Sequence, residues 1–162
     1  MGERGLFRGY ALNAIDAKGR VAIPAPFRKT IERKSNESVL VIGKHADDAC
    51  LTGYDMSWAD ELQARIERDE ARALDAGRSF DIHNSNRLAN TLTEDLSFDA
   101  SGRFIMPSFF RGKAEIGEWV LFLGTGNVFE MWNPHLLLKT TTVDEDIKDL
   151  ARHLLTERGV AA

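Results

Sequence analysis

The feature that most constrains this chain is a segment that occurs twice. Residues 15–28 read IDAKGRVAIPAPFR and residues 98–111 read FDASGRFIMPSFFR, and the two align without a gap with seven identities in fourteen positions. The identities include Gly and Pro, which are kept for backbone geometry and are costly to replace. One alternative is that both copies are merely the same turn, drawn from the small vocabulary of turn residues. Because the shared Pro and the final Arg lie beyond any turn, we interpret the pair as an internal duplication.

The size of the chain suits one domain or two small halves that share a core, since it has 162 residues. The N-terminus lacks an apolar stretch of signal-peptide length, and the runs WVLFL and VLVI are too short to span a bilayer. We therefore expect a cytoplasmic protein with no membrane partner. The single cysteine, Cys50, cannot form an intramolecular disulfide, and we expect it to be a buried apolar side chain rather than a nucleophile.

The net charge of −4 hides an uneven distribution along the chain. Residues 1–34 carry a charge of +5, which leaves −9 on the remainder. A basic region of this kind can bind phosphate whatever the total charge of the protein. The alternative is a solvated surface with uneven charge. The basic side chains of this segment are Arg4, Arg8, Lys18, Arg20, Arg28, Lys29, Arg33 and Lys34.

The first copy predicts a β-hairpin followed by a helix. Asp16 begins a turn and Gly19 takes its restricted position, after which residues 20–23 alternate as a short strand does. Pro24 ends that strand because it has no N–H to donate, and it suits the first turn of a helix through PAPFRKTIERK. Two more strands are predicted after this helix, at VLVIG and at residues 50–54.

The second copy repeats this order of elements. Asp99 and Gly102 take the turn positions, SFFRGKAEIG predicts a short helix or turn, and WVLFLG and NVFEMW predict strands. The GTGN between those strands lacks the rest of a dinucleotide fingerprint, so we interpret it as a hairpin turn. Neither module can bury much apolar area alone, and we expect a pseudo-symmetric pair with interleaved strands. The predicted fold class is therefore α+β, mainly β.

Two further segments have helical spacing. Residues 56–77 place apolar side chains at i, i+4 and i+8 and predict an amphipathic connector. A second stripe in the tail either covers this chain's own core or docks on a neighbouring subunit; it consists of Val143, Ile147, Leu150 and Leu154. The predicted organisation is a first repeat at residues 7–55, a helical connector at 56–90, a second repeat at 91–135 and a helical tail at 136–162.

The sequence gives little support for an enzyme or a metal site. The four histidines lie in different segments and lack the i, i+4 spacing that brings two imidazoles to one metal. KHADDAC, at residues 44–50, is rich in ligand types but has no zinc spacing and mixes hard and soft ligands, so we interpret it as a polar loop. No nucleophile elbow or P-loop occurs. We expect no catalytic residue, metal, cofactor or small-molecule substrate.

The two D-x-x-G-R segments, each leading through a short strand to Pro, together with FRG at residues 7–9 and GNVFEMW at 126–132, resemble the bacterial MraZ family within the AbrB-like transcription factors. The family's Asp followed four residues later by Arg is matched at Asp16 and Arg20 and again at Asp99 and Arg103. The resemblance implies a swapped-hairpin AbrB-like β-barrel, a ring-shaped homo-oligomer, and binding to short repeated boxes of double-stranded promoter DNA. It also implies repression of the division and cell-wall gene cluster and of the protein's own gene, and hence association with the nucleoid.

The residue types suggest how such DNA would be contacted. We expect Arg20 to present a bidentate fork to guanine in the major groove while Lys18 neutralises phosphate. Asp16 has the wrong charge for DNA, and we expect it to cap its turn and hold Arg20. The alternative is that Arg20 and Arg103 only pair with aspartates inside the fold. The predicted DNA-binding residues are Arg20, Lys18, Arg28, Arg8, Lys29 and Arg103, and the turn-structuring residues are Asp16, Gly19, Asp99 and Gly102.

Two rival functions predict different results. An antitoxin-like or scaffold module that binds another protein through its hairpins predicts weak, nonspecific retention of DNA and a stable complex with that protein. A hydrolase that uses the KHADDAC loop predicts bound metal after purification.

Overall fold

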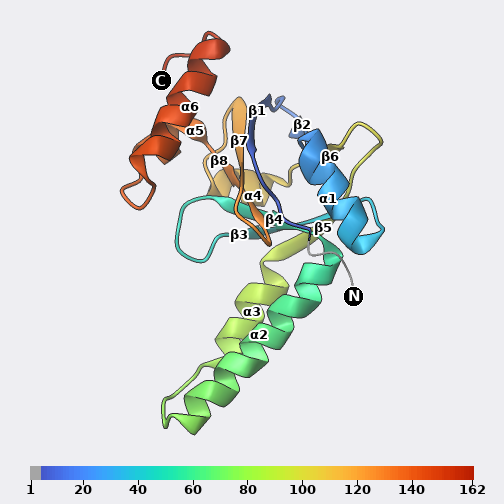
Figure 1. Ribbon diagram of the computed structural model, residues 1–162, viewed down its shortest axis with the longest axis vertical. Helices are drawn as coiled ribbons and strands as arrows, with labels where there is room; N and C mark the ends of the chain where they lie inside the picture. Colours follow the sequence, from blue (N-terminus) through green and yellow to red (C-terminus); the bar gives the residue numbers. More distant parts are fainter. Residues whose placement is uncertain (1–4) are drawn as a thin grey trace.

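The computed structural model describes residues 5–162, and its strands form two antiparallel sheets (Figure 1). The larger sheet has the order β1-β7-β8-β4-β3-β5, and the smaller pairs β2 with β6. The elements are β1 (Tyr10–Ala14), β2 (Arg20–Ala22), α1 (Ala25–Ser35), β3 (Val39–Lys44), β4 (Leu51–Tyr54), α2 (Met56–Asp75), α3 (Ile82–Thr91), β5 (Thr93–Ser97), β6 (Arg103–Ile105), α4 (Ser108–Lys113), β7 (Trp119–Gly124), β8 (Phe129–Trp132), α5 (Pro134–Leu138) and α6 (Glu145–Glu157).

The α+β class is confirmed, but the expected closed barrel is not found among the described residues. β1 and β5 form the two open edges of the larger sheet. β2 and β6 do not close the gap between these edges, because each is only three residues long and they pair with one another. Pro24 and Pro107, which lack the N–H that a longer strand would need, follow them closely and begin helices.

Strands from the two copies of the duplication interleave. The predicted hairpin pairing is wrong for the described residues, because the strands on either side of each turn pair with other strands rather than with each other. The name hairpin is kept below for each turn with its two flanking strands, residues 10–22 and 93–105. β1 pairs with β7, so that Tyr10 lies opposite Leu123, and β5 pairs with β3, so that Val39 lies opposite Ser97. β4 and β8 pair in the middle of the sheet and join the two halves. Each half therefore contributes an edge strand to the other, and the sheet needs both copies.

The main core is aromatic and draws on both copies. The ring of Phe129 lies 5.0 Å from that of Phe7 and 4.9 Å from that of Phe27, measured between centroids. Phe122 completes the group, and all four rings are at most 1% exposed. The burial of Phe27 on the inner face of α1 brings the helix that follows the first hairpin against strands of the second copy.

The predicted connector helix is confirmed as α2, and α3 runs back beside it. The two helices form a pair that projects away from the sheets (Figure 1). Hydrogen bonds from the Gln63 amide to Asn86 and from the Asn90 amide to Gln63 link them. Asp81 caps α3 by accepting the N–H of Asn84.

The tail helix α6 packs on this chain's own sheet. The predicted tail stripe contributes Val143, Ile147 and Leu154 to a second apolar cluster around Leu12, Leu121 and Trp132, whereas Leu150 does not belong to that cluster. Of the two alternatives for this stripe, covering the chain's own core is the one the structure shows. Across the described part of the chain, every helix is too short or too polar to cross a membrane.

A buried ion pair joins α1 to the start of α2. The Nζ of Lys34 lies 3.2 Å from Oδ1 of Asp55, whose side chain is 0% exposed. Within residues 5–162 that Oδ1 atom accepts no hydrogen bond, so the ammonium is the charge that compensates it. Oδ2 of Asp55 accepts the N–H of Ser57 and caps α2. The ammonium also lies over the rings of Phe7 and Trp58.

Candidate nucleic-acid interface

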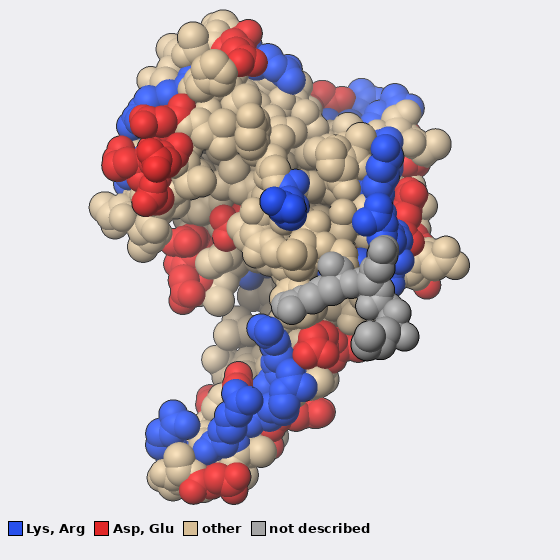
Figure 2. All heavy atoms as spheres, in the orientation of Figure 1, with Lys and Arg blue, Asp and Glu red and all other residues tan. Residues whose placement is uncertain are grey.

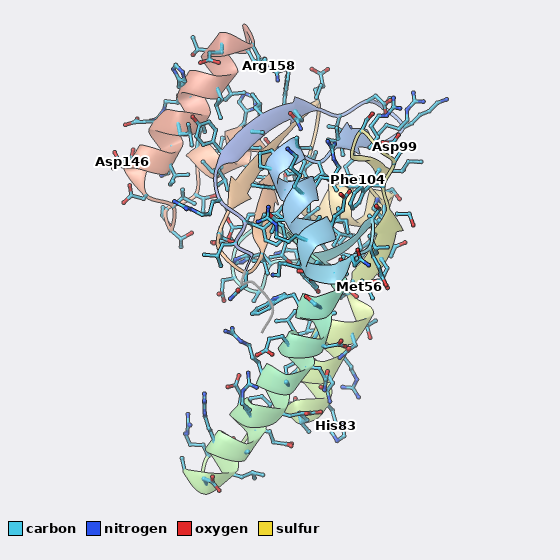
Figure 3. All side chains as sticks on the ribbon, turned by 45° about the vertical axis from the view of Figure 1, so that its right-hand side comes forward. Met56, His83, Asp99, Phe104, Asp146 and Arg158 are labelled. Atoms are coloured by element: carbon cyan, nitrogen blue, oxygen red, sulfur yellow. The ribbon has the colours of Figure 1, made fainter. Side chains whose placement is uncertain are left out.

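The β2–β6 pair is a short two-stranded ribbon with one apolar and one charged face. Val21 and Phe104 lie opposite one another and are each 3% exposed, so they fix the inner face to the core. Because side chains alternate along a strand, the neighbouring residues Arg20 and Arg103 point outward. Figure 3 shows Asp99 near the outer end of the second hairpin, with Phe104 closer to the body. The fold thus brings the two predicted arginines, 83 positions apart, to one outer surface.

Each arginine of this ribbon is held by the aspartate of its own turn. In the first hairpin, Oδ1 of Asp16 accepts the N–H groups of Lys18 and Arg20, and Oδ2 accepts Nε–H of Arg20 at 2.6 Å. In the second hairpin, Asp99 accepts the N–H of Arg103 and its Nε–H at 2.9 Å each. The aspartate therefore fixes the turn and the arginine side chain at the same time.

These hydrogen bonds lower the pKa of both carboxyl groups. For Asp16 the main cause is the backbone N–H of Arg20, followed by its side chain, and for Asp99 it is the backbone N–H of Arg103. Because the pKa is lowered in the folded protein, this contribution to stability is present above the usual range of a carboxyl group and is lost as the pH falls through the lowered value. Both aspartates thus stay charged at neutral pH and keep their arginines in place.

The pairing with aspartate leaves the two terminal nitrogens of each arginine available to bind another group. The aspartate engages Nε, whereas the two terminal nitrogens of Arg20 and Arg103 donate no hydrogen bond within residues 5–162. The side chains are 59% and 66% exposed. Each arginine does pair with the aspartate of its turn, but the pair lies on the exposed surface rather than inside the fold. A guanidinium held at Nε with both terminal N–H groups facing outward is suited to bidentate contact with an acceptor pair.

Glycines lock the two hairpins against each other. Gly19 has φ +86°, and a Cβ there would lie 2.8 Å from the carbonyl oxygen of Met106, in the other copy. The carbonyl of Gly19 accepts the N–H of Met106 at 2.8 Å, and that of Gly102 accepts the N–H of Ile23 at 2.8 Å. Gly102, at φ +81°, would likewise place a Cβ 2.9 Å from the carbonyl oxygen of Ile23. Both turns therefore need glycine for conformation and for close approach.

Replacing Gly19 with alanine is expected to lower the free energy of unfolding by about 2–4 kcal/mol, because positive φ disfavours a Cβ and the contact with Met106 would open. Gly77→Ala is the matched control, since Gly77 has φ +69° and a Cβ there would meet nothing within 4 Å. Urea unfolding at equal protein concentration measures both. Equal losses for the two variants would show that the close approach of the hairpins contributes nothing.

The last arginine of each repeated segment lies against the turn of the other copy. Arg111 donates from Nη1 to the carbonyl of Asp16 at 2.8 Å and from Nη2 to the carbonyl of Gly117 at 2.6 Å. Its counterpart Arg28 is half-buried, and its Nη1 lies where a Cβ on Gly102 would come within 2.9 Å. The sequence placed Arg28 among the DNA-binding residues and did not assign Arg111. The alignment of the two copies pairs Arg111 with Arg28 and could have identified Arg111 from the sequence.

The remaining predicted cations are spread over the surface. Lys18 is exposed at the turn of the first hairpin, and Lys29 is exposed on α1 directly after it. Arg8 lies at the other end of β1, beside the turn that joins β7 and β8, because Phe7 bridges to Gly126. Arg4, which contributed to the basic N-terminal segment, lies outside the described residues. The structure thus groups Lys18 and Lys29 with the ribbon and separates Arg8 from it.

The surface has separate regions of positive and negative charge. Figure 2 shows Lys and Arg side chains along α1 and on the projecting α2–α3 pair, while acidic side chains gather around α6. The basic residues of α1 are Arg28, Lys29, Arg33 and Lys34, and the acidic residues of α6 include Glu145, Asp146, Asp149 and Glu157. Although the chain has a negative net charge, the charged side chains of α1 are therefore mainly basic.

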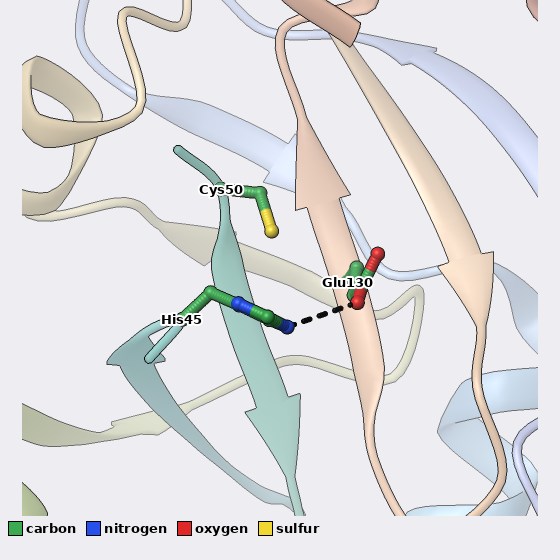
Figure 4. A group of neighbouring side chains, drawn as sticks. All are labelled: His45, Cys50 and Glu130. Carbon is green, nitrogen blue, oxygen red and sulfur yellow. Dashed lines mark ion pairs between the residues drawn. The ribbon is translucent and has the colours of Figure 1, made fainter. Parts of the chain in front are cut away.

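The KHADDAC loop joins β3 to β4 as expected, and it brings His45 and Cys50 near Glu130 of β8 (Figure 4). Nδ1 of His45 accepts the N–H groups of Asp47 and Asp48, which leaves the ring proton on Nε2. That nitrogen lies 3.3 Å from the Glu130 carboxylate and is thus engaged rather than free to bind a metal. Cys50 is 0% exposed, and burial raises the pKa of its thiol. These contacts favour a structural role for His45 and Glu130 over a zinc site or a nucleophile.

Comparison with known proteins adds a family assignment. A family model described as "MraZ protein, putative antitoxin-like" matches residues 6–77. The Transcriptional regulator MraZ of Rhodospirillum rubrum is 33% identical over 138 residues, which cover 81% of each chain. The protein of the same name from Ruegeria pomeroyi is 32% identical over 79% of this chain and 77% of its own, and that of Saccharophagus degradans is 30% identical over 93% and 98%.

Proposed function

Because this chain belongs to the MraZ family, we propose that it regulates transcription by binding promoter DNA in a sequence-specific manner. The observation that carries this proposal is the pair of arginines on the outer face of one β-ribbon, each fixed at Nε by the aspartate of its own turn. Side chains that are held before DNA arrives lose less conformational freedom on binding, and this ribbon holds two. The name of the relatives describes a regulator and not an enzyme.

The ribbon has the right shape and chemistry for the major groove. That groove is about 12 Å wide and admits a two-stranded β-ribbon, and Arg paired with O6 and N7 of guanine is its commonest specific contact. We propose that Arg20 and Arg103 read guanines in this way. Lys18 at the turn and Lys29 on α1 would then neutralise phosphates on either side, which adds affinity that does not depend on sequence.

One ribbon makes too few contacts for tight and selective binding. The chain carries a net charge of −4, so its total charge opposes DNA. We propose that several subunits, assembled as a ring-shaped homo-oligomer, engage repeated boxes together, because linked sites raise the effective concentration of each further contact. The targets would be the promoter of the division and cell-wall gene cluster and the protein's own gene, which the protein represses as part of the nucleoid in the cytoplasm.

The proposal also gives a meaning to the duplicated organisation. Residues 7–55 and 91–135 would be two AbrB-like repeats that exchange strands in a swapped-hairpin arrangement, joined by the connector at 56–90 and followed by the tail at 136–162. The cross-pairing of β1 with β7 and of β5 with β3 supports this interpretation. One copy of the reading hairpin would then come from each repeat.

The rival candidate is a protein-interaction module, which the words "antitoxin-like" in the family description favour. It predicts that the hairpins bind a partner protein. Under that function the purified chain would retain all DNA equally weakly and would leave the cell in a stable hetero-complex.

A nuclease footprint of the purified full-length protein across the DNA upstream of its own gene tests the two candidates. We expect several short protected boxes at a regular spacing, which appear together as the protein concentration rises. A coding fragment of equal length serves as the control and should show no protection at the same concentration and salt. Uniform or absent protection of the upstream fragment would contradict the proposed regulator.

A further inference from the structure

The outer face of the β2–β6 ribbon is symmetric except at one pair of positions. The duplication relates Arg20 to Arg103 and Ala22 to Ile105. In the ribbon, Arg20 lies opposite Ile105 and Ala22 lies opposite Arg103, so the four side chains form a square with the arginines on one diagonal. On the other diagonal, Ala22 is half-buried, whereas Ile105 is 62% exposed. The outer face of the ribbon therefore exposes a large apolar side chain at Ile105 and only a partly covered methyl group at Ala22, although the same two arginines flank both positions.

The position of Ile105 indicates a function for its exposed side chain. A single exposed aliphatic residue is ordinary on a protein surface. This one, however, stands directly across from one outward guanidinium and two residues along its strand from the other. A ligand that bridges the two arginines therefore passes over the face of the ribbon that also carries the isoleucine. The charge of the arginines favours a nucleic acid, and in the major groove the apolar group beside the base-edge acceptors is the C5-methyl of thymine.

We propose that Ile105 determines sequence specificity by contacting the C5-methyl group of a thymine next to the guanine that Arg20 reads. Side chains opposite one another in an antiparallel ribbon have Cβ atoms about 5 Å apart. Base pairs along one strand are about 3.4 Å apart, so Ile105 meets the base pair adjacent to the one below Arg20. This inference rests on the proposed DNA-binding function.

The difference between Ile105 and Ala22 also gives the ribbon a direction on DNA. Ala22 has one methyl group and is partly covered, so it cannot reach a base that lies beneath Ile105 in the reversed orientation. A box that contains guanines and a thymine in one order would fit the ribbon in one orientation only. A symmetric ribbon with two alanines would accept both.

The test compares two versions of the DNA fragment from upstream of the protein's own gene, one natural and one in which deoxyuridine replaces every thymidine. Deoxyuridine pairs as thymidine does and lacks only the C5-methyl group. Wild-type protein, Ile105→Ala and Leu88→Ala are titrated onto both fragments at one fixed salt concentration. Leu88 is the matched control because it is 56% exposed and lies on α3, away from the ribbon. Sedimentation of each variant shows whether its assembly is unchanged.

Wild type and Leu88→Ala are expected to bind the deoxyuridine fragment at least about fourfold more weakly, the loss for one buried methyl group, and more where several subunits engage. Ile105→Ala should bind the natural fragment as weakly as wild type binds the deoxyuridine one, and should not distinguish the two. The proposal is overturned if wild type ignores the methyl groups, if Ile105→Ala still responds to them as wild type does, or if Ile105→Ala changes the assembly. Failure of the proposed regulator looks different, since wild type would then bind the natural fragment no better than a coding fragment.

Discussion

Replacing Arg20 with alanine is expected to abolish the preference for the upstream fragment over other DNA. One bidentate contact between arginine and guanine contributes about 1–3 kcal/mol of discrimination, which is roughly 5- to 150-fold for each engaged subunit. Because the proposed oligomer uses several copies at once, these losses multiply, and specific binding should fall to the nonspecific level. Gel-shift titration with labelled upstream DNA and unlabelled coding DNA as competitor measures the preference.

Arg20→Lys is the matched control for this experiment, because it keeps the positive charge and loses the planar fork. We expect it to bind all DNA nearly as well as wild type binds a coding fragment, without restoring the preference. Both variants should sediment as wild type does, since the Arg20 side chain is exposed and, within residues 5–162, bonds only to Asp16 of its own turn. Unchanged preference in Arg20→Ala would refute the assignment of this arginine as a reading residue.

Replacing Lys34 with methionine is expected to lower the free energy of unfolding by about 3–5 kcal/mol, although methionine fills similar volume. The change leaves the carboxylate of Asp55 buried without its compensating charge, and it removes the cation from the rings of Phe7 and Trp58. Chemical denaturation at equal protein concentration measures the loss, because oligomerisation makes apparent stability depend on concentration.

Two further variants separate the buried charge from other effects of this substitution. Lys29→Met removes an exposed cation from the same helix and should change stability by less than about 0.5 kcal/mol. Adding Asp55→Asn to Lys34→Met removes the stranded charge while keeping a good helix N-cap, so it should recover part of the loss. If Lys34→Met were as stable as Lys29→Met, the ion pair would not anchor α1 to α2.

The sequence predicted most elements because they had a strong local signal, but it did not predict α3 or β5 as separate elements. Pro24 and Pro107 marked where strands give way to helices, and the spacing in residues 56–77 marked α2. The sequence did not predict that the larger sheet stays open. Whether a sheet closes into a barrel depends on which strands pair with each other. β2 pairs with β6, and no local sequence pattern predicts a contact across 83 positions.

The candidate interface was partly visible for the same reason. The duplicated D-x-x-G-R pattern located Asp16 and Arg20, and its turn chemistry is local. The shared outer face of Arg20 and Arg103 follows only from the register between β2 and β6. The roles of Arg111, which bonds to the opposite hairpin, and of exposed Ile105 depend on tertiary contacts. Charge alone grouped Arg8 with the hairpin, whereas the fold places it at the far end of β1.

The crossed pairing of the edge strands also determines when the protein can fold during its synthesis. β1 is made before the other described strands, but its one neighbour in the described sheet is β7, which the ribosome makes more than one hundred residues later. The first hairpin must wait as well, since β2 pairs with β6. Contacts so distant in sequence form slowly, and exposed strand edges are prone to mispairing while they wait. The nascent chain therefore gains its arginine-bearing ribbon only after β6 has emerged, and its aromatic core only after β7 and β8 have emerged.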